Sequence, residues 1–158
     1  MAQIHKLGFE TEIKCSADKY FGLFSYNITQ LSKLFPNIYK SIEVIRGDGT
    51  SVGSTRLWKF FKEGKEMAVK NRVTAFDKEK RSITVEVFEG EIMNYYKTSS
   101  AKLDVVPKQY AAGNGSLVKW SLEFEKVNDD IPNPTAYLDA LRVTTKEVSS
   151  WVGCKPFA

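Results

Sequence analysis

The stretch that decides the fold is Thr135-Ala-Tyr-Leu-Asp-Ala-Leu-Arg-Val-Thr-Thr-Lys-Glu-Val-Ser-Ser-Trp151. Tyr137, Leu141 and Val148 recur at spacings that place them on one face of an α-helix, with charged and polar residues on the opposite face. Two prolines precede Thr135, which is a suitable N-cap residue. The pattern predicts a long amphipathic helix against which the rest of the chain must pack.

Most of the chain before this helix alternates between apolar and polar residues, which is typical of strands buried on one side. The segments that alternate are 4–14, 39–46, 54–62, 66–76, 81–89, 92–106 and 116–127, with a polar loop expected at 107–115. Two short helices are expected between the first two strands, at 16–27, capped by Ser16, and at 28–34.

Short connections between the later strands imply antiparallel neighbours. The sequence therefore predicts an α+β domain over residues 1–158, in which a curved antiparallel sheet of seven strands wraps around the C-terminal helix.

Charge and composition exclude several classes of partner. The net charge is +4, but basic and acidic residues are interleaved, so no nucleic-acid partner is expected. The first residues lack the apolar core of a signal peptide and no window resembles a membrane span, so we expect a cytoplasmic protein. In that compartment Cys15 and Cys154 are expected to be free thiols.

Three segments carry a resemblance to a known family. They are the loop Gly47-Asp-Gly-Thr-Ser-Val-Gly-Ser54, the run Val87-Phe-Glu-Gly-Glu-Ile-Met-Asn-Tyr-Tyr-Lys-Thr98, and the strand Ser116-Leu-Val-Lys-Trp-Ser-Leu-Glu-Phe-Glu-Lys126 followed by Pro134-Thr135. With the element order, they resemble the birch-pollen-allergen superfamily, specifically its major latex protein branch in plants. The resemblance implies a helix-grip fold, a large apolar cavity between sheet and helix, binding of hydrophobic small molecules, and a part in defence and stress responses.

If the sheet encloses such a cavity, its ligand-binding wall is formed by the inward side chains of the strands and helices. The apolar candidates are Phe24, Trp58, Phe60, Met67, Val69, Ile83, Val85, Val87, Ala101, Leu103, Trp120, Leu122 and Leu141. The polar candidates are Arg56, Asn71, Glu89, Tyr95, Ser99, Tyr137 and Thr145. The alternation is equally compatible with a dense core that has no cavity.

Two of these polar positions support specific hypotheses. Arg56 and Glu89 could form an internal ion pair. Thr144 and Thr145 interrupt an otherwise apolar helix face, which suggests incomplete packing beside a cavity. On that hypothesis Thr145→Leu would fill the space and weaken ligand binding without unfolding the domain.

Two functions follow from the resemblance. The first is a carrier or reservoir for an apolar small molecule that is sterol-, flavonoid-, alkaloid- or hormone-like, in a monomer or weak dimer. The alternative is an enzyme of specialised metabolism that condenses or isomerises its substrate in the same cavity, for which Glu89 and Tyr95 are the only catalytic candidates. The Lys–Tyr pair of the condensing relatives has no match by motif.

Other chemistries are disfavoured. The loop at 47–54 has neither the lysine nor the spacing of a phosphate-binding loop, so it is either a permissive turn or a simple anion-binding concavity. His5 is the only histidine and has no metal-ligating companion, so no metal or cofactor is expected.

Overall fold

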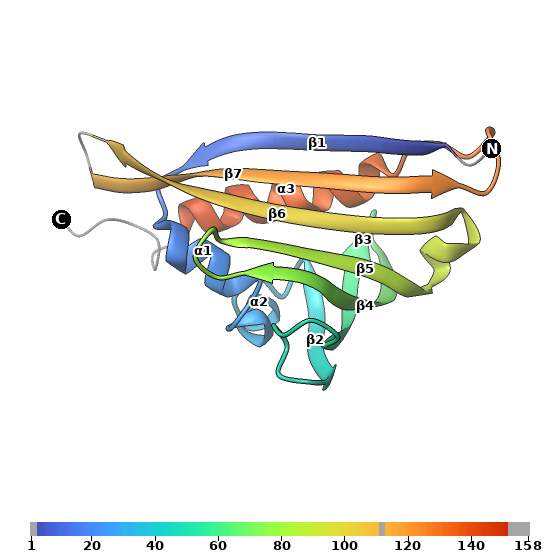
Figure 1. Ribbon diagram of the computed structural model, residues 1–158, viewed down its shortest axis with the longest axis horizontal. Coiled ribbons are helices and arrows are strands. Elements are labelled where there is room, and N and C mark those ends of the chain that lie inside the picture. The colour runs from blue at the N-terminus through green and yellow to red at the C-terminus, as the bar shows by residue number, and fades with distance from the viewer. Residues whose placement is uncertain (1–2, 111–112, 152–158) are drawn as a thin grey trace.

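The computed structural model describes residues 3–110 and 113–151, and within them it shows the predicted α+β fold (Figure 1). The strands form one seven-stranded antiparallel sheet in the order β1-β7-β6-β5-β4-β3-β2. The elements are β1 (Ile4–Ile13), α1 (Ala17–Leu23), α2 (Ile28–Leu34), β2 (Tyr39–Arg46), β3 (Thr55–Lys62), β4 (Lys65–Asp77), β5 (Ser82–Gly90), the 3-10 turn η1 (Glu91–Asn94), β6 (Tyr96–Tyr110), β7 (Gly113–Lys126) and α3 (Thr135–Ser150).

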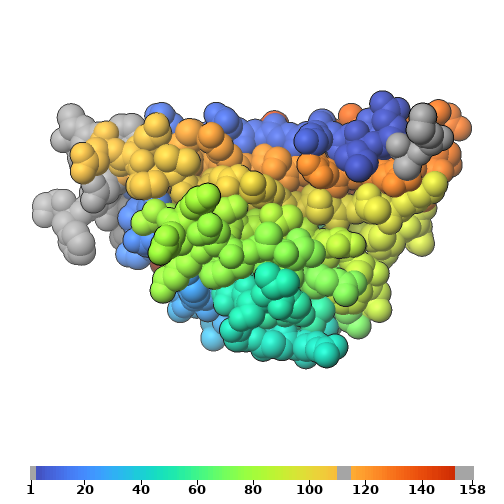
Figure 2. All heavy atoms as spheres, in the orientation of Figure 1, coloured from blue at the N-terminus to red at the C-terminus, as the bar shows by residue number. Residues whose placement is uncertain are grey.

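The sheet curves over α3, which runs behind β1, β7 and β6 in the view of Figure 1. Strands β1 and β2 are the two edges, so the sheet is not closed, and α1 and α2 connect one edge to the other. In the space-filling view the outer side chains from β1 to β4 form a continuous cover over the helix (Figure 2). The interior between sheet and helix therefore contains both the core and any internal site.

Local capping explains where the helices begin and end. Ser16 Oγ accepts a hydrogen bond from the Lys19 amide at 3.3 Å, which confirms the predicted cap of α1. The predicted extension of α1 to residue 27 is wrong, because the Asn27 amide donates to Gly22 O at 2.7 Å and closes the chain into a turn. The predicted cap of α3 at Thr135 is also wrong: Pro134 is the N-cap residue, since its carbonyl accepts the Leu138 amide.

Strand β6 differs from its predicted range at both ends. The strand begins at Tyr96 and not at the predicted residue 92, because η1 precedes it and places Ile92 in the core. Its end reaches Tyr110, and it pairs with β7 through Lys108 opposite Gly115. Glycine and proline in residues 107–115 predicted a loop there. That prediction is wrong for residues 107–110 and 113–115, which pair across β6 and β7 and lengthen both strands.

Two further expectations from the sequence concern the cysteines and membrane-spanning segments. Cys15 is fully buried and disulfide-bonded, so the prediction of a free thiol there is wrong; whether two cysteines meet is set by the fold and not by their position in the sequence. Residue Cys154 lies outside the described residues. In the described ranges, none of the helices is both long enough and apolar enough to cross a membrane.

Candidate ligand-binding cavity

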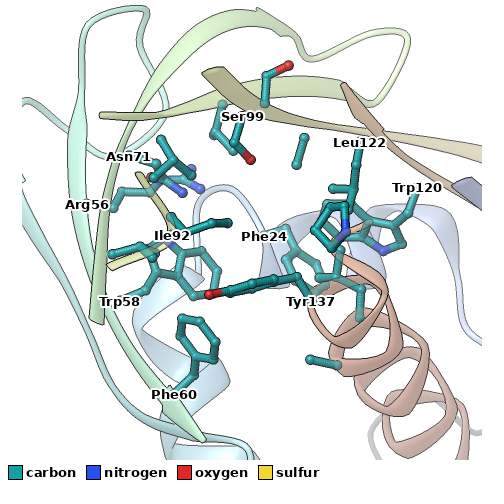
Figure 3. A pocket seen from close by; sticks show the side chains of 18 of the residues that line it. Phe24, Arg56, Trp58, Phe60, Asn71, Ile92, Ser99, Trp120, Leu122 and Tyr137 are labelled. Atoms are coloured by element: carbon teal, nitrogen blue, oxygen red, sulfur yellow. The ribbon is translucent and has the colours of Figure 1, made fainter. Parts of the chain in front are cut away.

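The inward face of the sheet and α3 enclose a cavity of about 140 Å³ (Figure 3). That volume is close to the cavity that holds one benzene ring in a well-packed protein. Most of the predicted wall residues line it: Phe24, Arg56, Trp58, Phe60, Val69, Asn71, Ile83, Val85, Val87, Ser99, Ala101, Trp120, Leu122, Tyr137 and Leu141. The fold thus gathers around one apolar space residues from strands β3 to β7, from the C-terminal end of α1 and from α3.

Two predicted wall residues belong to the packed core instead. Leu103 and Met67 are buried, but neither lines the cavity. Strand periodicity assigns a side chain to the inner face, but it does not distinguish the part of that face that is filled from the part that is hollow.

The predicted ion pair between Arg56 and Glu89 is not formed. The pairing of β4 with β5 shifts register between Lys70 and Asn71, so that Lys70 faces Glu89 while Asn71 faces Val87. This irregularity turns Glu89 to the outer side of the sheet, where its carboxylate lies 2.9 Å from Lys70 Nζ. Glu89 is therefore outside the cavity.

Tyr95 is also outside the cavity. It follows the 3-10 turn and is 45% exposed, because that turn interrupts the strand periodicity from which its inward position was inferred. The two residues nominated for catalysis thus lie on the surface.

Thr145 is buried and hydrogen-bonded, but it does not line this cavity. Its hydroxyl lies 2.8 Å from the Tyr20 hydroxyl and donates to Leu141 O, while the Tyr20 oxygen accepts from Trp120 Nε1 at 2.9 Å. Thr144 in turn binds the Tyr39 hydroxyl at 2.7 Å. The two threonines satisfy two buried phenols and neither lines the cavity between the sheet and α3, so incomplete packing beside them stays a prediction.

Five lining residues escaped the sequence analysis. They are Tyr39, Ile92, Ser100, Pro134 and Ala140. Ala140 was available from the sequence, since it follows Tyr137 by three residues on the same helical stripe. Ile92 and Pro134 had no such signal, because they lie in a turn and before a helix.

Arg56 is the unusual member of the wall. Its side chain is only 2% exposed, and its Nε and Nη2 atoms donate to Gly49 O at 3.0 and 2.5 Å. Burial lowers the pKa of Arg56 to about 10, so the guanidinium still carries its charge at neutral pH.

Two polar atoms of the cavity wall have no hydrogen-bond partner among the described residues, namely Asn71 Oδ1 and Trp58 Nε1. Asn71 is 5% exposed and pairs directly with Arg56 across β3 and β4. Figure 3 shows the Arg56 and Asn71 side chains next to each other at one end of the cavity, with Ser99 above them and with Trp120 and Leu122 opposite.

The phenols of the wall are protonated at neutral pH. Burial raises the pKa of Tyr39 to about 12, against the opposing effect of its bond to Thr144. Burial, with a smaller effect from the Glu91 carboxylate, raises the pKa of Tyr137 to about 12 as well. Both groups therefore act as neutral hydrogen-bonding partners.

The glycine loop between β2 and β3 satisfies its own amides. Asp48 accepts hydrogen bonds from the amides of Thr50 and Ser51 at 2.9 and 2.7 Å, and from the Ser51 hydroxyl at 2.6 Å. These bonds, the Ser51 hydroxyl first, hold the pKa of the Asp48 carboxyl well below its usual range. An incoming anion would meet a carboxylate there, so the structure favours the turn over the anion-binding concavity.

The chemistry available in the cavity is limited. Among the described residues that line it there is no carboxylate, lysine, histidine or cysteine, so it lacks the usual pair for general acid–base catalysis. The described part of the chain also contains no cluster of three or more histidine, cysteine or acidic residues that could hold a metal ion. The cavity combines apolar walls with one cation and a few neutral polar groups, which suits binding.

The comparisons with known proteins agree on one family. Residues 2–153 match the model of the pathogenesis-related protein Bet v 1 family. Major latex protein 146 of Papaver somniferum is 37% identical over 147 residues, which cover 93% of this chain and 90% of that protein. MLP-like protein 43 of Arabidopsis thaliana is 37% identical over 145 residues, covering 92% and 90%.

Solved structures agree with these relatives. The crystal structure of major latex-like protein 151 from Panax ginseng superposes with a TM-score of 0.84 at 28% identity, covering 93% of this chain and 96% of that one. Norcoclaurine synthase from Thalictrum flavum, in complex with dopamine and hydroxybenzaldehyde, gives a TM-score of 0.74 at 22% identity over 94% and 86% of the two chains, which shows a shared fold. This chain therefore belongs to the Bet v 1 family of pathogenesis-related proteins, in its major latex protein branch.

Proposed function

We propose that this protein is a carrier or reservoir that holds a hydrophobic small molecule in the cavity between the sheet and α3. The observation that carries the proposal is an internal space whose walls are mainly aromatic and aliphatic, with a few polar groups gathered at one end. Affinity would come chiefly from the apolar area that the ligand buries, at roughly 25 cal/mol per Å² before the costs of ordering.

The cavity supports a carrier better than an enzyme. The two residues nominated for catalysis, Glu89 and Tyr95, lie outside it, and the described lining residues offer no carboxylate or amine as general acid or base. Norcoclaurine synthase has the same fold but is too distant in sequence to lend its activity to this chain.

The proposal includes a biological setting. We place the protein in the defence or stress responses of a plant, acting in the cytoplasm as a monomer or weak dimer, because of its relationship to the major latex proteins. The disulfide at Cys15 is disfavoured in a reducing compartment, so a fluorescent fusion imaged in plant cells is the direct test of the location.

The binding proposal is tested by intrinsic tryptophan fluorescence. Trp58 lines the cavity, and its indole nitrogen has no partner whose loss would complicate substitution by phenylalanine. Trp151, beyond the end of α3, does not line it and is the matched control.

A panel of sterol-, flavonoid-, alkaloid- and hormone-like compounds should include ligands that change the emission. That change should shrink in Trp58→Phe and persist in Trp151→Phe. If a folded sample shows no response to the whole panel, the carrier proposal is wrong.

A further inference from the structure

We propose that the ligand of this cavity is a monocarboxylic acid whose carboxylate binds Arg56 while its apolar body occupies the aromatic end. The inference rests on the proposed binding function and specifies the class of ligand. Its starting point is that Arg56, almost completely buried, faces the cavity with no described carboxylate in an ion pair with it.

No carboxylate among the residues that the structure describes forms an ion pair with Arg56. Asp48, in the loop that Arg56 contacts, binds its own loop, and Glu89 binds Lys70 on the outer face. A buried cation without a partner is costly, so the cavity presents a site at which an anion is preferred over a neutral group.

The backbone holds the guanidinium in place but does not neutralise it. Both bonds of Arg56 go to a single neutral acceptor, the carbonyl of Gly49, and they use Nε and Nη2. That carbonyl belongs to the glycine loop, which Asp48 fixes through the Thr50 and Ser51 amides. The cation is therefore positioned before any ligand arrives, which reduces the ordering cost of binding.

The neighbours of Arg56 point to the polar end of a ligand at the same place. Asn71 pairs with Arg56 on the neighbouring strand and presents a buried amide whose oxygen has no partner among the described residues. Trp58 presents an indole N–H that likewise has no described partner. The Ser99 hydroxyl points into the cavity from β6 (Figure 3). Asn71 Nδ2 can donate to a carboxylate oxygen, Asn71 Oδ1 can accept from an adjacent hydroxyl group, and the indole and serine can donate to acceptors.

The charge balance favours a carboxylate over a phosphate. Arg56 is the only cation among the described lining residues, and a single negative charge balances it. A phosphate monoester carries nearly two charges at neutral pH and would leave one of them uncompensated in an apolar space. The planar guanidinium also matches the geometry of a carboxylate.

The test compares matched acids and alcohols. Phenylacetic acid against phenylethanol, and naphthaleneacetic acid against naphthaleneethanol, are titrated into the whole protein by calorimetry at neutral pH. Each pair shares an aromatic body, one ring in the first pair and two fused rings in the second, and its members differ in charge. We expect each acid to bind at least about tenfold more tightly than its alcohol.

The decisive variant is Asn71→Asp, which is nearly isosteric and places a carboxylate opposite Arg56. It should remove the preference for the acids, while the alcohols still bind. Arg56→Met should have the same effect, with circular dichroism to establish that it folds. Lys70→Met, which removes a positive charge from the outer side of β4 next to Asn71, should keep the preference for the acids.

The outcomes separate the two proposals. If acids and alcohols bind equally well, or if Asn71→Asp keeps the preference for acids, the inference is wrong and the carrier function stands. If neither acids nor alcohols bind to the folded protein, the inference is wrong, and the fluorescence response to the wider panel decides the carrier proposal.

Discussion

The hydroxyl of Tyr20 lies 2.8 Å from Thr145 Oγ1, so a hydrogen bond connects the first helix to the last. Because Thr145 gives its own proton to Leu141 O, and Trp120 Nε1 donates to the Tyr20 oxygen, the Tyr20 proton must point to Thr145. The chain of bonds therefore runs in one direction, from β7 through α1 to α3. It holds the helix against the sheet at one end of the cavity.

Breaking this connection should destabilise the domain. Thr145→Val keeps the shape of the side chain but leaves the buried Tyr20 hydroxyl without its acceptor, which should cost about 1–3 kcal/mol in the free energy of unfolding. Denaturant titration measures the loss, and Thr29→Val on an exposed position of α2 is the control. In a double-mutant cycle, Tyr20→Phe combined with Thr145→Val should cost less than the sum of the two; strict additivity would contradict the coupling.

The cavity should respond to filling differently from the core. Ala101 lines the cavity, so Ala101→Leu should reduce the affinity for naphthaleneethanol several-fold while leaving the stability unchanged or raised by up to about 1 kcal/mol. Val118 is fully buried and does not line the cavity, so Val118→Leu should destabilise the domain by about 1–3 kcal/mol. Calorimetry and thermal unfolding measure the two effects. A strong destabilisation by Ala101→Leu would indicate that the space is not hollow.

Gly90 should not tolerate a side chain. Its φ is +138°, and an added Cβ would lie 2.7 Å from Ala68 O on the neighbouring strand. Gly90→Ala should therefore destabilise the protein by about 1–3 kcal/mol in denaturant titration. Gly64→Ala is a matched control, because its φ is +80° but nothing lies within 4 Å of an added Cβ. Equal costs for the two variants would show that the contact with Ala68 is relieved by a shift of the backbone.

The hydrogen bonds to Asp48 should make the stability depend on pH in the acid range. The pKa of Asp48 is lowered on folding, so its contribution is complete above the pKa of the unfolded chain and is lost as the pH falls through the folded value. The stability difference between the natural protein and Asp48→Asn should be largest at neutral pH and should shrink as the pH is lowered below about 4. Denaturant titrations at a series of pH values measure it. A difference that is constant with pH would contradict the role of the charge.

The sequence by itself determined the class of fold and most of the inward face. Helical and strand periodicities are local properties, so the run that ends in Trp151 and the alternation in residues 116–127 identified the long helix and the strand that packs on it. The same alternation placed Arg56 and Asn71 on the inner face together with the aromatic wall.

The tertiary structure decided which of these side chains act together. Glu89 points outward because the register shift adds one residue to its strand, and an extra residue reverses the side on which every later side chain lies. Tyr95 lies outside the cavity because a 3-10 turn precedes it and interrupts the strand. It also decided that the helix Thr135–Ser150, which decides the fold, meets Tyr20 through Thr145 and faces a space rather than a filled core. Such pairings join residues far apart in the chain, and periodicity within one segment contains no information about them.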